Sequence, residues 1–241
     1  MLEAGLWGLL GGLALVLGAV AGVVRDVPTR VIGAVMAFGA GVLISALAFE
    51  LTAEAFEASG GREVVLGLLG GAVTFYVGDR LLDQRGGTDR KRSGGQQAGS
   101  AAQGLVLGAL LDGIPESVAI GVSLVDGGTV GVAFVAAVFL SNVPEGMSAA
   151  TGLVKAGRSK RWVLCLWLAV ALVSGLASLV GYAVLGDASA SVVAVIQAFA
   201  AGAILTMLAD TMMPEAFEHR GRSVGLITTL GFALAFLLSQ A

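Results

Sequence analysis

Residues 104–125 read GLVLGALLDGIPESVAIGVSLV, an apolar stretch that carries two carboxylates and one proline. A helix of about 20 apolar residues is long enough to cross the hydrocarbon core of a bilayer. A carboxylate inside such a helix costs about 2.5 kcal/mol or more on insertion scales, and intramembrane acids are usually functional. The stretch therefore predicts a membrane-spanning helix with a polar site near its middle.

The composition of the whole chain agrees with this interpretation. Of the 241 residues, 56% are hydrophobic and only 13% are charged, whereas a soluble domain carries about 25% charged residues. The mean hydropathy is +0.91. We therefore expect an all-α polytopic membrane protein, one transmembrane domain over 1–241, that is not an enzyme. The single Cys165 excludes a disulfide framework, and a net charge of -3 gives no reason to expect a nucleic-acid partner.

Eight stretches are long and apolar enough to cross the bilayer. They are 5–22, 31–53, 64–82, 104–125, 129–153, 162–186, 192–214 and 223–239. With eight spans, 13 of the 14 Lys and Arg residues belong to one alternate set of loops, counting Arg80 at the end of the third span, and Arg62 alone belongs to the other. Because basic loops stay in the cytoplasm, we expect a multi-pass protein of the cell membrane with both termini outside. The polar segment 84–103 predicts a flexible, solvated cytoplasmic loop.

Spans 2 and 7 resemble each other. At a constant offset of 161 residues, 10 of the 21 positions in 37–57 are identical to those in 198–218. Five crossings separate the two copies, so they run in opposite directions through the membrane. The pattern predicts an inverted repeat of three helices on each side of a central pair, a 3+2+3 arrangement that is common in secondary transporters.

The central pair of spans carries matching polar motifs. Asp112 and Glu116 are four residues apart and share one face of the fourth span. The fifth span repeats the pattern with Ser141, Asn142 and Glu145, and each span has a proline directly before its Glu. Proline frees a backbone carbonyl one turn earlier, so these groups predict an oxygen cage for a cation. An alternative is that each acid is protonated and hydrogen-bonded between helices.

Five acids in total lie within the predicted spans, and no span contains a Lys, Arg or His near them. They are Glu50, Asp112, Glu116, Glu145 and Asp210. We infer that their counter-charge is a bound cation or protons from outside the sequence. Glu50, Asp210 and Ser141 are then candidates for the substrate pathway. The competing function is a proton-coupled carrier of a small organic cation or amino acid, in which the same acids titrate.

These motifs resemble the ZIP (Zrt/Irt-like) divalent metal transporters, particularly their bacterial branch. The resemblance is carried by Asp-Gly-Ile-Pro-Glu-Ser at 112–117, where the family has His-Asn-x-Pro-Glu-Gly, and by Ser-Asn-Val-Pro-Glu-Gly at 141–146. It covers nearly the whole chain. The resemblance implies metal uptake into the cytoplasm by an elevator-like movement, in a homodimer, with no resident cofactor.

The resemblance also implies a set of metal ligands. Glu116 and Glu145 match family ligands directly, Asp112 stands where the family often has His, and Asn142 stands at a position that ligates in some members. Gly113 replaces the Asn of the family motif. A donor set of oxygens alone suits Mn²⁺ or Fe²⁺ better than Zn²⁺, although carboxylates also bind Zn²⁺.

Overall fold

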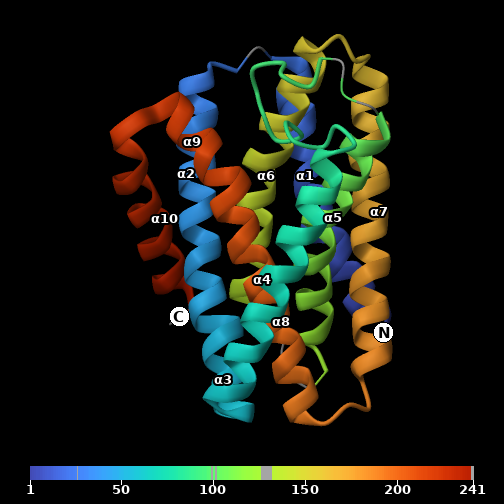
Figure 1. Cartoon of the computed structure of the whole chain (residues 1–241), viewed down its shortest axis with the longest axis vertical. Helices are drawn as coiled ribbons and strands as arrows, with labels where there is room; N and C mark the ends of the chain where they lie inside the picture. The colour runs from blue at the N-terminus through green and yellow to red at the C-terminus, as the bar shows by residue number, and fades with distance from the viewer. Residues whose placement is uncertain (26, 99, 101, 126–131, 240–241) are drawn as a thin grey trace.

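The computed structural model describes residues 1–25, 27–98, 100, 102–125 and 132–239, and these form a bundle of long helices (Figure 1). The major helices are α1 (Leu2–Val24), α2 (Thr29–Ala46), α4 (Gly61–Asp83), α5 (Ala102–Val122), α6 (Val132–Lys155), α7 (Lys160–Leu185), α8 (Ala190–Met207) and α10 (Val224–Ser239). Shorter elements extend two of them: η1 (Leu47–Thr52) and α3 (Ala53–Ser59) follow α2, and η2 (Leu208–Met212), α9 (Met213–Arg220) and η3 (Gly221–Ser223) follow α8. No strand occurs among the described residues, as expected from the sequence.

Seven helical stretches of the described chain are long and apolar enough to cross a membrane. The last of them is 50 residues long, Ala190–Ser239, and therefore exceeds the roughly 20 residues that one crossing needs. The backbone reverses at Gly221, which has a φ of 59°, and α10 then runs back beside α2 (Figure 1). This reversal supports two crossings within the last stretch, and the count of eight spans stays a prediction.

The helices pack as two groups. In the first helix group, α1 packs extensively against α6 and α7, and α5 packs against α7. In the second helix group, α4 packs against α8, while α10 and α9 pack against α2. Contacts of α6 with α2 and of α5 with α8 join the groups.

Both copies of the predicted repeat contain a π-helical turn. Leu47 begins η1 and Leu208 begins η2, at the same offset of 161 residues. The helices α2 and α8 that lead into these turns run in opposite directions (Figure 1). Both features are compatible with an inverted repeat, which stays a prediction.

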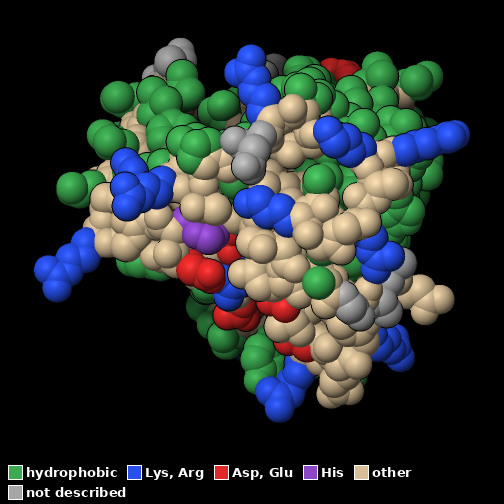
Figure 2. All heavy atoms as spheres, turned by 90° about the horizontal axis from the view of Figure 1, so that it is seen from above, with side chains coloured by type: hydrophobic (Ala, Val, Ile, Leu, Met, Phe, Trp, Pro, Cys, Tyr) green, Lys and Arg blue, Asp and Glu red, His purple; other side chains and the backbone are tan. Residues whose placement is uncertain are grey.

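The basic loops lie together at one end of the bundle. This end, uppermost in Figure 1, holds the end of α1, the start of α2, the segment after α4, the α6–α7 loop and the end of α9. Seen from above, Lys and Arg side chains are spread over this end, whereas Asp and Glu side chains gather in a smaller area (Figure 2). The basic end is the one that we predict to face the cytoplasm.

Cysteine labelling in intact cells tests this orientation. In a Cys165→Ala background, Ser159→Cys at the exposed basic end is expected to resist a membrane-impermeant maleimide, because the membrane keeps the reagent out of the cytoplasm. Ala58→Cys, exposed at the other end, is expected to react. Permeabilised cells provide the control, in which both positions react. Labelling of Ser159→Cys from outside would reverse the orientation.

Candidate functional site

The acids of the central pair lie inside the first helix group. Pro115 lies within α5 and Pro144 within α6, and Asp112, Glu116 and Glu145 are all at most 4% exposed. The sequence also allows α6 to lie very close to α1, because a Cβ at Gly146 would overlap the backbone of Leu15. This close packing positions the polar motif of α6 at the centre of the group.

Asn142 is fixed by the neighbouring helix. Its side-chain amide donates a hydrogen bond to the carbonyl oxygen of Gly11 in α1 at 3.1 Å. Asn142 also interacts with the carboxylate of Glu116. The carboxylates of Glu116 and Glu145 interact electrostatically with each other. The structure thus brings Glu116, Asn142 and Glu145 of the two Pro-Glu motifs together.

Asp112 is bound by an arginine from outside the predicted spans. The Nε and Nη2 atoms of Arg90 contact the two carboxylate oxygens of Asp112 at 2.7 and 2.9 Å. Nη2 also lies 2.6 Å from the carboxylate of Asp79 in α4. Burial alone would lower the pKa of Arg90, but the ion pairs with Asp112 and Asp79 outweigh it and raise that pKa above its ordinary value.

A lysine occupies the space between the two motifs. The Nζ atom of Lys91 lies 3.0 Å from Glu145 and 3.5 Å from Asp112, and the residue is only 4% exposed. Our inference that the counter-charge comes from outside the sequence is therefore wrong for Asp112 and Glu145. The chain itself supplies two cations, because the segment after α4 folds back into the bundle.

Glu116 has a different environment. Its Oε1 atom is buried and has no hydrogen-bond partner among the described residues. A buried carboxylate oxygen without a partner is rare and energetically costly. This atom is the one most available to a cation in the cluster.

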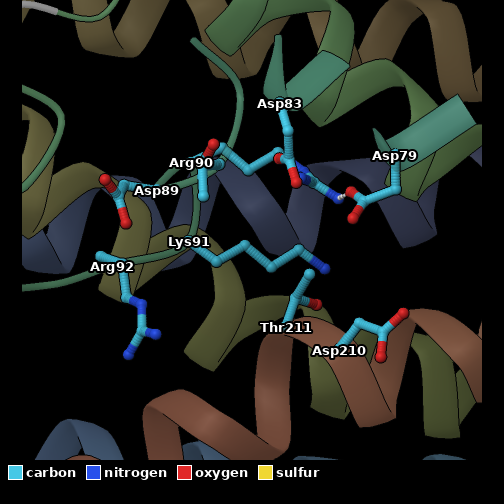
Figure 3. A pocket seen from close by; sticks show the side chains of 9 residues that line it. Asp79, Asp83, Asp89, Arg90, Lys91, Arg92, Asp210 and Thr211 are labelled. Atoms are coloured by element: carbon cyan, nitrogen blue, oxygen red, sulfur yellow. Dashed lines mark ion pairs between the residues drawn. The ribbon is translucent and has the colours of Figure 1, made fainter. Parts of the chain in front are cut away.

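The remaining candidates make no hydrogen bond or ion pair with these acids among the described residues. Ser141 is fully buried, but its hydroxyl donates to the carbonyl oxygen of Val138 in its own helix at 2.9 Å. Glu50 is half-buried in η1, and no hydrogen bond or ion pair of the described residues joins it to the cluster. Asp210 in η2 is exposed and lines a hollow of about 130 Å³ together with Asp79 (Figure 3).

In this conformation the cluster is not a complete metal cage. Among the described residues, no group of three or more His, Cys, Asp and Glu side chains is placed to hold a metal ion. Arg90 and Lys91 line the same hollow as Asp210, and Arg90 extends toward Asp79 (Figure 3). The site in this structure is thus an acid cluster neutralised in part by the chain's own cations.

The segment that supplies these cations was expected to be a solvated loop. The structure instead buries four of its polar side chains, those of Arg90, Lys91, Ser93 and Gln97. We call residues 87–98 the docked segment. It packs inside because buried partners compensate the cost of removing its charged and polar groups from water.

Glu215 in α9 is one of these partners, although from the sequence we favoured a solvated helix end for this acid. It is fully buried and accepts hydrogen bonds from the backbone N–H of Ser93 at 2.8 Å, from the Ser93 hydroxyl and from Ser148 at 3.3 Å. Arg92 pairs with Glu215 at 3.4 Å and also with Glu218. Within the sequence, the signal for this docking is the run of three consecutive cations at 90–92 in a chain whose spans lack counter-charges.

Comparisons with known proteins show the family to which the chain belongs. A family model described as ZIP zinc transporter matches residues 83–239, which contain the docked segment, both Pro-Glu motifs and Glu215. A protein of Arabidopsis thaliana that bears the name "Putative zinc transporter" is 27% identical over 187 residues, which cover 76% of this chain. The match covers 30% of the length of that relative. Since the family model matches well over half of the sequence, this chain belongs to the ZIP zinc transporter family.

Proposed function

We propose that this chain transports a divalent metal cation of the Zn²⁺, Mn²⁺ or Fe²⁺ class across the cell membrane into the cytoplasm. The observation that carries the proposal is the buried acid cluster on α5 and α6, which attracts cations strongly enough to draw Arg90 and Lys91 inside the bundle. A transported ion would use the same negative charge. Membership of a transporter family supports this function over catalysis.

Glu116 and Glu145 are the proposed ligands, with Asn142 and Asp112 completing the shell. The Oε1 atom of Glu116 has no hydrogen-bond partner among the described residues. To bind a metal ion, Glu145 would exchange its ion pair with Lys91 for the metal. All of these donors offer oxygen, which favours Mn²⁺ and Fe²⁺ among the candidate ions.

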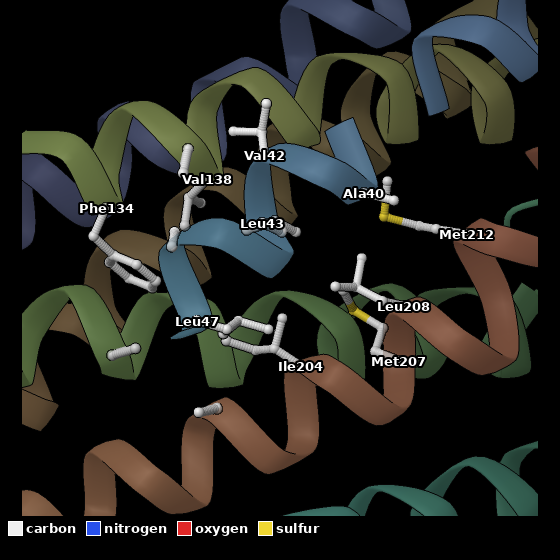
Figure 4. Close-up of a cluster of buried hydrophobic side chains, with 14 of the residues drawn as sticks. Ala40, Val42, Leu43, Leu47, Phe134, Val138, Ile204, Met207, Leu208 and Met212 are labelled. Carbon is white, nitrogen blue, oxygen red and sulfur yellow. The ribbon is translucent and has the colours of Figure 1, made fainter. Parts of the chain in front are cut away.

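The two helix groups suggest how the ion moves. The ligands belong to the first helix group, so a shift of this group against the second would carry the ion from one side to the other in an elevator-like manner. Where helices of the two groups meet directly, the interface is apolar: Val138 of α6, Leu43 of α2 and Ile204 of α8 belong to one buried hydrophobic cluster (Figure 4). Apolar contacts are non-directional and therefore permit such a shift without breaking specific bonds.

Metal-dependent melting of the purified protein tests the proposed site. We expect Mn²⁺ or Zn²⁺ at about 100 times its Kd to stabilise the folded protein by about 2.7 kcal/mol, since the ion binds only the folded state. Glu116→Gln is expected to lose this shift in melting temperature, whereas Glu57→Gln, which changes an exposed acid in α3, keeps it. A metal-dependent shift that survives in Glu116→Gln would place the site elsewhere.

The homodimer in the bilayer that the family resemblance implies also stays a prediction. The mass of the purified protein in native mass spectrometry measures it directly.

A further inference from the structure

The docked segment connects the two helix groups through a series of charged contacts. Arg90 binds Asp112 of α5 in the first group and Asp79 of α4 in the second. Lys91 reaches the first group through Glu145, and Arg92 reaches the second through Glu215. Three consecutive side chains therefore hold together the two parts that must move apart in an elevator-like movement.

The backbone of the segment is held as firmly as its side chains. The hydroxyl of Ser148 in α6 donates to the carbonyl oxygen of Lys91 at 2.7 Å, and Ser93 N–H donates to Glu215 of α9 at 2.8 Å. The segment is thus attached to the first helix group at the carbonyl of Lys91 and to the second at the N–H of Ser93. These bonds place the lysine at one position and do not depend on its charge.

Glycines in the neighbouring helices leave room for the segment. A Cβ at Gly152 of α6 would overlap the carbonyl oxygen of Arg92 and crowd the side chain of Gln97. A Cβ at Gly108 of α5 would overlap the side chain of Arg90. At these two positions any larger residue would push the segment out, although nothing in the helices themselves requires glycine there.

The segment fills the space beside the acids. The hollow lined by Arg90, Lys91, Asp112 and Glu145 retains only about 10 Å³ of free volume. A single water molecule needs about 10–15 Å³ by this measure, so a hydrated metal ion does not fit while Lys91 is in place.

We propose that the docked segment is a tethered counter-ion that competes with the metal for the acid cluster. With the segment docked, the cluster is neutralised in part by Arg90 and Lys91, and the contacts of Arg90 and Arg92 hold the two helix groups together. A divalent ion that binds Glu116 and Glu145, with Asp112 completing the shell, competes with Lys91 for Glu145 and with Arg90 for Asp112. Loss of the Arg90–Asp112 pair then loosens the lock between the two helix groups. This inference rests on the proposed function and adds its regulation: the transporter is closed by its own cations until metal displaces them.

The exchange of Lys91 for a metal ion depends on the balance between two electrostatic energies. Removing a charged group from water costs several kcal/mol, and a buried ion pair recovers this only with good geometry, so the docked state is only moderately favoured. A divalent ion interacts with the same carboxylates through twice the charge. Because the lysine is tethered, its effective concentration is in the millimolar range and the metal must outcompete it.

Metal affinity measured by calorimetry tests the competition. Lys91→Met is expected to tighten binding of Mn²⁺ by about 10- to 100-fold, which corresponds to a docked fraction of about 90–99% in the native protein. Lys160→Met, which removes an exposed lysine at the start of α7, is the matched control and is expected to leave affinity unchanged.

A second variant separates competition from a simple change of charge. Gly152→Ala alters no charge and no proposed ligand, yet its methyl group meets only the docked segment among its nearest neighbours. We expect it to tighten Mn²⁺ binding as well. Gly225→Ala in α10, where a Cβ would meet nothing within 4 Å, is the matched control.

The position of the segment can be followed without transport. In a Cys165→Ala background, Gln97→Cys lies at a fully buried position and is expected to react slowly with a maleimide in detergent. Addition of Mn²⁺, or the Gly152→Ala change without metal, is expected to accelerate this reaction because either one releases the segment.

The outcomes separate this inference from the proposed function. If metal stabilises the native protein but Lys91→Met and Gly152→Ala bind it no more tightly, and metal does not accelerate labelling, the competition is refuted and the proposed function stands. If neither the native protein nor the two variants bind metal, both proposals fail. Binding that is detectable only in Lys91→Met and Gly152→Ala supports both.

Discussion

Glu116→Gln and Glu145→Gln are each expected to reduce metal uptake into proteoliposomes by more than about 100-fold. Losing a group that only supports a metal ligand typically costs 10–100-fold in affinity or activity, so losing a ligand itself should cost more. The amide keeps the shape of the side chain and removes a charge that is expensive to bury, so both variants should fold. Uptake of radioactive ⁵⁴Mn or ⁶⁵Zn measures the loss, with Glu57→Gln as the control.

The double variant tests whether the two acids act on one ion. Groups that function as a unit are strongly non-additive, so the double variant is expected to be no worse than either single one. Multiplying losses would instead assign the two acids to separate steps. Normal metal uptake in both single variants would refute the proposed ligands, and a selective loss of proton-driven flux of an organic cation or amino acid would favour that alternative carrier.

Arg90→Met is expected to destabilise the protein by about 3–5 kcal/mol. The change leaves Asp112 buried with only Lys91 at 3.5 Å, and breaking a buried ion pair by removing one partner typically has this effect. The free energy of unfolding in detergent, measured by denaturant titration with a chelator present, reports the change. Arg161→Met, which alters an exposed arginine of α7, is expected to have little effect.

Removing both partners is expected to restore much of this loss. Arg90→Met combined with Asp112→Leu leaves no uncompensated charge in the pair, and apolar replacements of a buried ion pair are often neutral or stabilising. Asp79 also loses its partner, and its Oδ1 atom is buried although the side chain is 16% exposed, so the double variant is not expected to recover the full stability. A double variant as unstable as the sum of its single changes would mean that Arg90 and Asp112 stabilise the fold independently.

The sequence predicted the helices well because they depend on local patterns, whereas the role of the central motif as a metal site stays a prediction. Apolar length alone identifies the spans, and the matching Pro-Glu motifs place Glu116 and Glu145 on helices that the structure indeed brings together. The alternation of basic loops likewise predicted which loops share one end of the bundle (Figure 1).

The partners of the acids could not be predicted in the same way. Arg90 and Asp112 are 22 residues apart, and Ser93 and Glu215 are 122 residues apart, so their contacts arise from the tertiary packing of a segment with no regular periodicity. Glu54 and Glu215 illustrate the limit. They occupy equivalent positions of the predicted repeat, yet Glu54 is exposed and Glu215 is fully buried, because only Glu215 receives the docked segment.

The π-helical turn η2 changes which side chains of α9 face the interior of the bundle. Successive residues of a helix are about 100° apart around its axis, and a π turn accommodates one residue more than an α turn. The turn therefore resets the register, so that the face buried in α8 and the face that carries Glu215 are selected independently of one another. The extra residue turns the side chains that follow it by about 100° relative to a continuous α-helix, and η1 does the same for the residues of α3, so in both copies the helical stripe before the turn does not fix which residues face inward after it.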